Sequence, residues 1–326
     1  MKEALYYKQE GDLIRCQLCP HVCLLAEGEQ GECQVREVKE GKVRTINYQR
    51  VSAVAMDPIE KKPLFHFQPG SRILSLGTVG CNLKCKFCQN YRIAHEPRTE
   101  TEQLSSQQAV ELALNKDSIG LAYTYSEPLV WYEYVLKTAK LAHKEGLKNV
   151  LITNGMINPQ PLQELLPYID AINLDFKSFT DDFYQEICGG KLTPVKRTVE
   201  LIYQTTLLEI TTLLIPGLND SEEEIKQLVD WIAGFDCQIP LHLARYFPRY
   251  QLDKEPTSIE KLLEAKSVAE KYLDYVYLGN ISDNQHRITY CPDCKYPVIK
   301  RNYNQVQIDL VKQRCPECGT KIKVSL

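Results

Sequence analysis

The chain is organised around one short segment, Gly80-Cys81-Asn82-Leu83-Lys84-Cys85-Lys86-Phe87-Cys88-Gln89-Asn90. It places three thiols in the spacing Cys-x3-Cys-x2-Cys. A cube of four irons and four sulfides takes four protein thiolates, so three on one loop would leave one iron open to a small molecule. A structural zinc loop is the alternative, but zinc sites close with four ligands, and no fourth partner stands nearby in the sequence. We therefore predict that Cys81, Cys85 and Cys88 hold an iron–sulfur cluster with one open iron.

Composition narrows the class of protein. The 326 residues suffice for one large barrel with small modules, or for two domains. A formal net charge of −3 and a pI near 6.1 provide no global positive field for nucleic acid. No apolar run is long enough for a bilayer, and the first residues lack the apolar core of a signal peptide. Thirteen cysteines, mostly in three tight groups, indicate metal sites in a reducing compartment. We expect a soluble, cytoplasmic protein without membrane contact.

The N-terminal segment contains a second cysteine group, made of Cys16, Cys19, Cys23 and Cys33. A glycine-rich turn precedes Cys33 and would let it fold back onto the other three. Four soft ligands at this density predict a metal centre, either zinc or iron–sulfur. Zinc is slightly preferred, because nothing in the sequence indicates an open coordination position.

The C-terminal segment contains the third group, two Cys-x2-Cys hooks. Cys291 and Cys294 form the first hook, and Cys315 and Cys318 form the second. Each hook turns tightly enough for two sulfurs to share one tetrahedral ion, as in zinc ribbons and rubredoxins. We predict zinc here, with mononuclear iron as the alternative. The tail is locally basic, but it has few interleaved aromatic residues, so a solvated surface is favoured over a nucleic-acid interface.

The region between these groups alternates buried strands with amphipathic helices, a pattern typical of parallel βα units. Ser221 and Glu224 predict a capping box at the start of one helix. The predicted strands are 72–77, 119–125, 149–153, 171–176, 208–215 and 239–246, and the predicted helices are 105–115, 129–144, 161–168, 195–204, 221–234 and 258–272. A further short strand is expected within 41–48.

Six such units predict an α/β protein with a partial (β/α)6 TIM-like barrel, although a doubly wound open sheet would give almost the same pattern. The predicted domains are a Cys-rich N-terminal module at 1–50, the barrel at 51–285 and a zinc-ribbon-like tail at 286–326.

The cysteine spacing, with the aromatic Phe87 before the last cysteine, resembles the radical S-adenosylmethionine (radical SAM) superfamily. The resemblance implies that a [4Fe–4S] cluster binds the amino and carboxylate groups of S-adenosylmethionine through its open iron. It also implies that an electron from the cluster breaks the sulfonium bond and releases a 5′-deoxyadenosyl radical.

Active-site residues of such barrels lie at the carboxyl ends of the strands. There the chain is similar to pyruvate formate-lyase-activating enzymes, with Tyr125-Ser126-Glu127-Pro128 in place of their Gly-Gly-Glu-Pro, which holds the methionyl ammonium. Thr153-Asn154-Gly155 matches their Thr-Asn-Gly, and Asp175-Phe176-Lys177 resembles their Asp-Leu-Lys. The cofactor-binding residues that the resemblance implies are Phe87, Ser126, Glu127, Thr153, Asn154, Asp175 and Lys177.

Longer segments resemble the radical SAM enzymes of the AmmeMemoRadiSam system, which are related to pyruvate formate-lyase-activating enzymes. These segments are Asp57–Phe67, Cys188–Leu192 and Ile215–Asp220. The predicted function is reductive cleavage of S-adenosylmethionine and hydrogen abstraction from an unknown substrate, which could be a protein. An electron donor such as flavodoxin or ferredoxin is expected. The alternatives are a non-catalytic iron–sulfur electron carrier and a zinc-ribbon protein acting on RNA.

Overall fold

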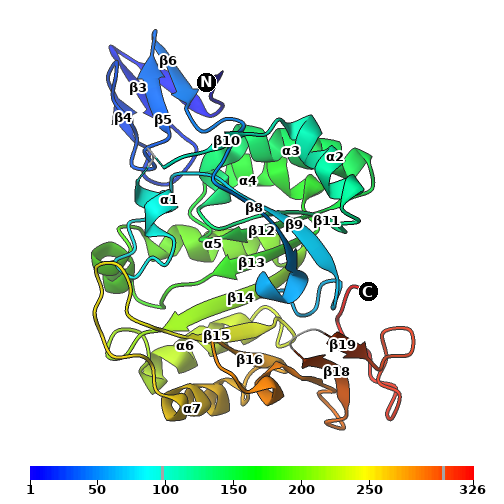
Figure 1. Ribbon diagram of the computed structural model, residues 1–326. Coiled ribbons are helices and arrows are strands. Elements are labelled where there is room, and N and C mark those ends of the chain that lie inside the picture. The colour runs from blue at the N-terminus through cyan, green and yellow to red at the C-terminus, as the bar shows by residue number, and fades with distance from the viewer. Residues whose placement is uncertain (97–98, 303–304) are drawn as a thin grey trace.

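A central eight-stranded sheet organises the computed structural model, which describes residues 1–96, 99–302 and 305–326. Its strand order is β16-β15-β14-β13-β12-β11-β9-β8, and all neighbours pair in parallel except β8, which runs antiparallel to β9 (Figure 1). The strands are β8 (Ala53–Pro58), β9 (Arg72–Gly77), β11 (Gly120–Tyr123), β12 (Lys148–Thr153), β13 (Ala171–Asp175), β14 (Leu207–Leu214), β15 (Leu241–Arg245) and β16 (Val276–Gly279).

Helices connect successive parallel strands, as the sequence predicted. The α-helices are α1 (Tyr91–His95), α2 (Ser106–Asn115), α3 (Tyr132–Lys144), α4 (Pro159–Leu165), α5 (Leu192–Ile202), α6 (Glu222–Ala233) and α7 (Ile259–Ala269). Shorter helical turns are η1 (Ile59–Lys61), η2 (Pro128–Trp131), η3 (Leu166–Tyr168), η4 (Phe183–Ile187) and η5 (Asn284–Arg287). The series of strand–helix units from β9 to α7 is therefore confirmed.

The strand order separates the two folds that the periodicity left open. From β9 to β16 each new strand is added on the same side of the previous one. Crossovers between parallel strands are right-handed. When every new strand is added in the same direction, the connecting helices therefore all lie on the same face of the sheet. A doubly wound sheet instead reverses its strand order at a switch point. The sequential order excludes that alternative.

Two strands of the sheet were not predicted, β8 and β16. The β8 sequence, Ala-Val-Ala-Met-Asp-Pro, has weak alternation and ends in a proline, which sheets accept at an edge strand. β16 has only four residues, too few to show a period. Both are the outer strands of the sheet, where one neighbour is missing and sequence requirements are relaxed.

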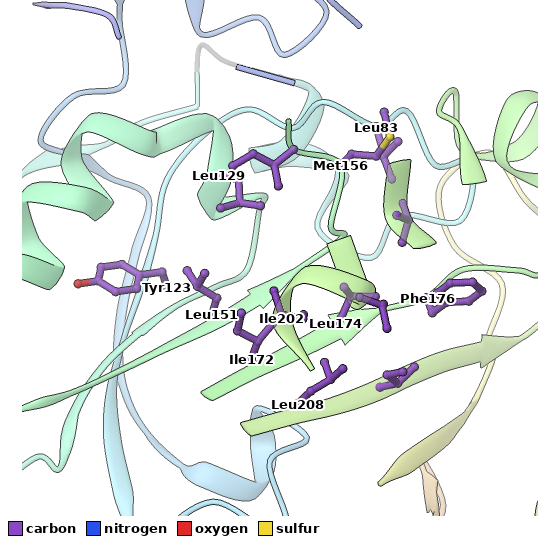
Figure 2. Packing of buried hydrophobic residues seen from close by; sticks show 14 of the residues in the cluster. Leu83, Tyr123, Leu129, Leu151, Met156, Ile172, Leu174, Phe176, Ile202 and Leu208 are labelled. Atoms are coloured by element: carbon purple, nitrogen blue, oxygen red, sulfur yellow. The ribbon is translucent and has the colours of Figure 1, made fainter. Parts of the chain in front are cut away.

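Each face of the sheet has its own apolar layer. On the helix side, Leu151, Leu174 and Leu208 pack with helical residues such as Ile202 (Figure 2). On the other face, Ala122, Val150 and Ala171 pack against Ile59, Leu64 and Phe67, which follow β8. The Asn173 side chain also donates to the Pro63 carbonyl (2.8 Å). The segment between β8 and β9 therefore fills the face that the helices leave open.

The predicted capping box of α6 is only half formed. The Ser221 hydroxyl accepts from the Glu224 backbone N–H (3.2 Å), as expected. The Glu224 carboxylate does not return to Ser221 but accepts from the Phe179 backbone N–H (2.8 Å) and from the Ser178 hydroxyl. The tertiary contact with the loop after β13 competes with the local motif, because the loop brings two donors to the same carboxylate.

Small antiparallel sheets flank the central one (Figure 1). At the N-terminus, β1 (Lys2–Glu3), β6 (Lys42–Thr45) and β5 (Arg36–Lys39) form one, and β2 (Tyr7–Glu10), β3 (Leu13–Cys16) and β4 (Leu24–Leu25) form another. β7 (Arg50–Val51) pairs with β10 (Glu102–Gln103). At the C-terminus lie β17 (Thr289–Tyr290), β18 (Pro297–Asn302) and β19 (Gln305–Ile308). The strand predicted within 41–48 is β6. None of the described helices combines the length and the apolar character needed to cross a membrane.

The C-terminal module shares its apolar core with the central domain. Phe65, Tyr275 and Tyr277 pack in one cluster with Cys291 and Cys315. Polar contacts cross the same junction through His66, whose Nδ1 donates to the Lys323 carbonyl (2.8 Å) while its Nε2 accepts from the Tyr277 hydroxyl (2.7 Å). The acceptor role of Nε2 requires the neutral imidazole, because both ring nitrogens of a protonated histidine are donors.

His66 makes this junction sensitive to acid. Burial lowers the pKa of His66 to about 4, from the usual 6.5. The unfolded chain takes up a proton below about pH 6.5 while the folded protein does not, so stability is lost as the pH falls from 6.5 towards 4. We expect the free energy of unfolding to fall by about 2 kcal/mol more between pH 7 and pH 5 in the wild type than in His66→Gln. Urea titrations at both pH values measure this, with His143→Gln as the control. Equal pH dependence in all three proteins would contradict it.

Candidate active site and metal centres

The cysteine loop connects β9 to α1 and is anchored in the core. Leu83 lies beside Met156 (Figure 2), and a Cβ at Gly190 would approach the Leu83 side chain to 2.3 Å, so a larger residue there would displace Leu83. The backbone N–H groups of Lys84 and Lys86 donate to the carbonyls of Cys188 and Ile187 (2.7 and 2.9 Å). These contacts hold the backbone on both sides of Cys85.

The three thiols of this loop do not form a compact single-ion set in the described residues. Within the described ranges, the C-terminal cysteines are the only set of three or more metal-ligating side chains whose ligand atoms all lie within 4.8 Å of one another. Around one zinc, sulfurs at about 2.3 Å from the metal lie about 3.8 Å apart. Thiolates of a cluster bind different irons and are therefore further apart. For Cys81, Cys85 and Cys88 the structure therefore gives no sign of a single-ion site.

Glu127 follows β11 and lies next to the loop. Its carboxylate accepts from the Leu129 backbone N–H (3.0 Å), the Thr153 hydroxyl (2.7 Å) and the Asn154 backbone N–H (2.8 Å). Burial raises the pKa of Glu127 to about 7, although these hydrogen bonds favour the charged form. The carboxylate also interacts electrostatically with Cys81. A cationic group bound at this position would stabilise the ionised form.

Asn154, at the end of β12, links Glu127 to the cysteine loop. Its side-chain amide donates to the Asn82 side chain (3.0 Å) and to the Cys81 sulfur (3.7 Å). Thr153 is bound to Glu127 rather than directed at the loop. Sequence comparison predicted both residues at the site, and the structure shows that Asn154 is the one that contacts a cysteine.

The residues after β13 place a positive charge, the Lys177 ammonium, at the same site as the Glu127 carboxylate. The Lys177 ammonium lies 3.0 Å from Asp175 and 6.0 Å from the centre of the Phe87 ring. Burial acts to lower the pKa of Lys177, but Asp175 and the thiols of Cys85 and Cys188 outweigh it and raise that pKa. The structure therefore brings Phe87, Asp175 and Lys177 to the cysteines. The Ser126 hydroxyl donates to the Thr78 carbonyl (2.8 Å), in the segment that leads into the cysteine loop.

Tyr125 occupies a backbone conformation that normally belongs to glycine. Its φ is +71°, in the left-handed region, where a bulky residue is strained. Three contacts hold it: its hydroxyl donates to Asp57 (2.7 Å), its carbonyl accepts from Asn90 (2.7 Å), and the Lys62 ammonium lies 4.6 Å from its ring centre. The chain therefore keeps the glycine geometry of this turn with a tyrosine.

Asp57 and Lys62 are functional candidates that sequence reasoning missed. They form a buried ion pair (2.8 Å), and Lys62 is only 3% exposed. Burial acts to raise the pKa of Asp57, yet the hydrogen bonds from Lys62 and Tyr125 outweigh it and lower that pKa. Both residues lie in the segment Asp57–Phe67, one of the segments that carry the resemblance. Cys188, in another of these segments, also lies at the site: its thiol and burial raise the pKa of Cys85.

The four C-terminal cysteines have the geometry of a single-ion site. The sulfurs of Cys291 and Cys318 are 3.4 Å apart, and those of Cys294 and Cys315 are 3.6 Å apart. These values are close to the spacing of about 3.8 Å around one tetrahedral ion. The group that the sequence predicted can therefore bind one metal ion.

The N-terminal cysteines gather at the turns around β3 and β5. Cys16 and Cys33 are buried, while Cys19 and Cys23 are partly exposed. The Cys23 sulfur accepts from the Glu32 backbone N–H (3.5 Å), which closes the turn before Cys33. Burial raises the pKa of the Cys19 thiol to about 12 and of the Cys33 thiol to about 11. Without a metal to displace the protons, these thiols are therefore neutral.

We expect Tyr125→Phe to lower the free energy of unfolding by about 1.5–3 kcal/mol, the usual contribution of a hydrogen bond to a charged group. The hydroxyl is lost, while the strained backbone and the ring over Lys62 remain. Denaturant titration under anaerobic conditions measures the change, and the exposed Tyr290→Phe serves as the control. An effect no larger than that of the control would contradict the role of the Asp57 contact.

Comparisons with known proteins agree with this geometry. The Radical SAM superfamily matches residues 75–232, from β9 into α6. The uncharacterized protein MJ0808 of Methanocaldococcus jannaschii is 38% identical over 336 residues and covers 100% of both chains. The pyruvate formate-lyase-activating enzyme of Clostridium pasteurianum is 26% identical, over 60% of this chain and 87% of that enzyme.

One solved structure supports the fold. Streptococcus suis SuiB bound to S-adenosylmethionine is similar with a TM-score of 0.52 and 17% identity, over 64% of this chain and 52% of that one. From the sequence matches, the cysteine loop and the parallel sheet that positions it, this chain belongs to the radical SAM superfamily, as an enzyme related to pyruvate formate-lyase-activating enzymes.

Proposed function

We propose that the protein cleaves S-adenosylmethionine reductively and uses the product radical to abstract hydrogen from a protein substrate. The observation that carries this proposal is convergence: Glu127, Asn154 and Lys177, from the ends of three neighbouring strands, all reach the Cys81–Cys88 loop. A cation-accepting carboxylate and an anion-accepting ammonium beside one open iron suit the amino and carboxylate ends of an amino acid.

Each residue has one task in this scheme. Cys81, Cys85 and Cys88 would hold a [4Fe–4S] cluster, which would supply the electron for cleavage of the sulfonium bond. Glu127 accepts from the methionyl ammonium, and Lys177 neutralises the methionyl carboxylate. Asn154 positions the loop at Cys81. Leu83, Met156 and the other apolar residues beneath the loop exclude water from the reacting atoms.

A protein substrate is proposed from two observations. The chain is similar to enzymes named as activators of pyruvate formate-lyase. A surface hollow of about 590 Å³ also lies beside the end of the cysteine loop, between Tyr91 and Arg92 on one side and Pro248–Tyr250 on the other. Tyr91 and Tyr250 stack there at 4.6 Å. A hollow open to the surface suits a loop of a macromolecule.

By its longer motifs we assign the chain to the AmmeMemoRadiSam system, with flavodoxin or ferredoxin as electron donor.

The alternative of a non-catalytic electron carrier is disfavoured by the same residues. A carrier needs cysteines and a docking surface, but not a buried carboxylate and a buried ammonium beside its cluster. Burying a carboxylate and an ammonium is costly even when both have partners, and an electron carrier has no use for either charge.

The test is anaerobic reconstitution with iron and sulfide, followed by S-adenosylmethionine and dithionite. We expect 5′-deoxyadenosine and methionine from the wild type and neither from the Cys81→Ala, Cys85→Ala, Cys88→Ala triple variant. Lys177→Met removes one charge-assisted contact and should weaken S-adenosylmethionine binding by about tenfold to hundredfold. Lys191→Met, an exposed lysine nearby, is the matched control. Product formation by the triple variant would overturn the proposal.

We further propose that Cys291, Cys294, Cys315 and Cys318 hold zinc as a structural ion. A module of this size lacks enough core to fold alone, and it shares Phe65 and Tyr277 with the central domain. We therefore expect Cys315→Ser to lose about one zinc per chain and to increase hydrogen exchange in residues 289–302 and 65–67. Metal analysis and hydrogen exchange measure this, with the exposed Cys237→Ser as the control. Unchanged zinc content in Cys315→Ser would contradict the assignment.

A further inference from the structure

We propose that Cys16, Cys19, Cys23 and Cys33 bind a second iron–sulfur cluster, which passes electrons to the cluster of the Cys81–Cys88 loop. The binding site stands on its own observations, whereas its role as an electron relay rests on the proposed function of that loop.

The first observation is the spacing of the sulfurs. The C-terminal cysteines lie at the distances of a single ion, and within residues 1–96, 99–302 and 305–326 no other set of three or more ligand atoms does so. The N-terminal thiols lie near enough to interact electrostatically with one another, yet in the described residues neither they nor Cys81, Cys85 and Cys88 form such a compact set. In this respect the N-terminal group resembles the loop and not the single-ion site. We therefore infer a cluster here, in contrast to the slight preference for zinc from the sequence.

The second observation is a buried cation with unused donors. Arg36, on β5, is 1% exposed and lies 3.1 Å from its ion-pair partner Glu133. In the described part of the chain, its Nε and Nη1 atoms have no hydrogen-bond partner. Its charge acts on the sulfurs of Cys16, Cys33 and Cys19. Buried donors without partners are costly. A centre with four thiolates carries net negative charge and would satisfy this guanidinium.

The third observation is direct contact between the segment that carries the N-terminal cysteines and the Cys81–Cys88 loop. His21 Nε2 lies 2.6 Å from the Asn82 carbonyl, and Asn82 is the neighbour of Cys81. Gly80 has φ +95°, and a Cβ there would lie 2.8 Å from the Cys33 carbonyl and 2.5 Å from Val35. A side chain at this position cannot be accommodated. The glycine lets the two cysteine segments pack together, which places the two cysteine groups side by side.

The N-terminal group also has an exposed side. A surface hollow next to Cys23 is lined by His21, Glu29 and Gly31–Glu32, and Cys19 and Cys23 are partly exposed. A donor protein of the flavodoxin or ferredoxin class can approach there. It would give one electron to the N-terminal cluster, which would pass that electron to the loop cluster and return to its oxidised state. One donor electron is consumed for each S-adenosylmethionine cleaved.

The site is tested in the Cys81→Ala, Cys85→Ala, Cys88→Ala variant, which leaves the N-terminal group untouched. After anaerobic reconstitution with iron and sulfide, we expect about four irons per chain and an electron paramagnetic resonance signal after dithionite reduction. Adding Cys16→Ser, Cys19→Ser and Cys23→Ser should remove both, while circular dichroism shows that the fold persists. A second zinc and no iron in the first variant would overturn the proposal, whether or not the wild type cleaves S-adenosylmethionine.

The relay is tested with two reductants. In the Cys16→Ser, Cys19→Ser, Cys23→Ser variant, we expect the flavodoxin-driven rate of 5′-deoxyadenosine formation to fall by about tenfold or more, and the dithionite-driven rate by no more than about twofold. Cys237→Ser, a matched change at an exposed thiol outside the three groups, should alter neither rate. Equal loss with both reductants, or no loss with flavodoxin, would overturn the electron-relay role.

Discussion

The carboxylate of Glu127 is the contact on which the active site depends. It joins the end of β11 to the end of β12 through three hydrogen bonds, and one of them fixes Asn154, which contacts Cys81. A carboxylate buried without partners is strongly unfavourable. Satisfied by backbone and hydroxyl donors, it instead aligns two strand ends, and it would carry negative charge once a cationic group binds beside it. The position of the cysteine loop relative to the sheet follows from this arrangement.

The face of the sheet that the segment between β8 and β9 covers contains buried charged side chains that are paired with one another. Glu209 on β14 binds His242 on β15 (2.6 Å) and the His66 backbone N–H (2.7 Å). Burial acts to raise the pKa of Glu209, but His242 outweighs it and that pKa is lowered. Asp57 and Lys62 form a second buried pair nearer the active site. The segment between β8 and β9 supplies partners to both pairs, and so couples the sheet, the active-site turn at Tyr125 and the C-terminal module.

The two cysteine modules are attached in different ways, and the difference matters for their roles. The C-terminal group packs against Phe65 and Tyr277, at the β16 edge of the sheet, and its sulfurs are close enough for one ion. The N-terminal group packs against the cysteine loop itself, through Asn82 and Gly80. The position of the C-terminal group at the sheet edge suits a structural role. The position of the N-terminal group against the cysteine loop suits a role in the reaction.

Three features could be predicted from the sequence: the cysteine groups, the order of strands and helices, and the positions of Glu127, Asn154 and Lys177 at strand ends. These features are local, because ligand spacing, periodicity and the turn after a buried strand depend on residues that are close together in the chain. Three other features follow only from the tertiary structure: the direction in which strands are added to the sheet, the edge strands β8 and β16, and the half-formed capping box. In that capping box the Phe179 backbone N–H donates to the carboxylate of Glu224. The tertiary structure also decided that Tyr125 keeps a left-handed turn, that Lys62 is buried, and that Arg36 lies beside the N-terminal cysteines. Each depends on contacts between residues far apart in the chain, because burial and charge pairing are properties of the packed structure and leave no periodic pattern in the sequence.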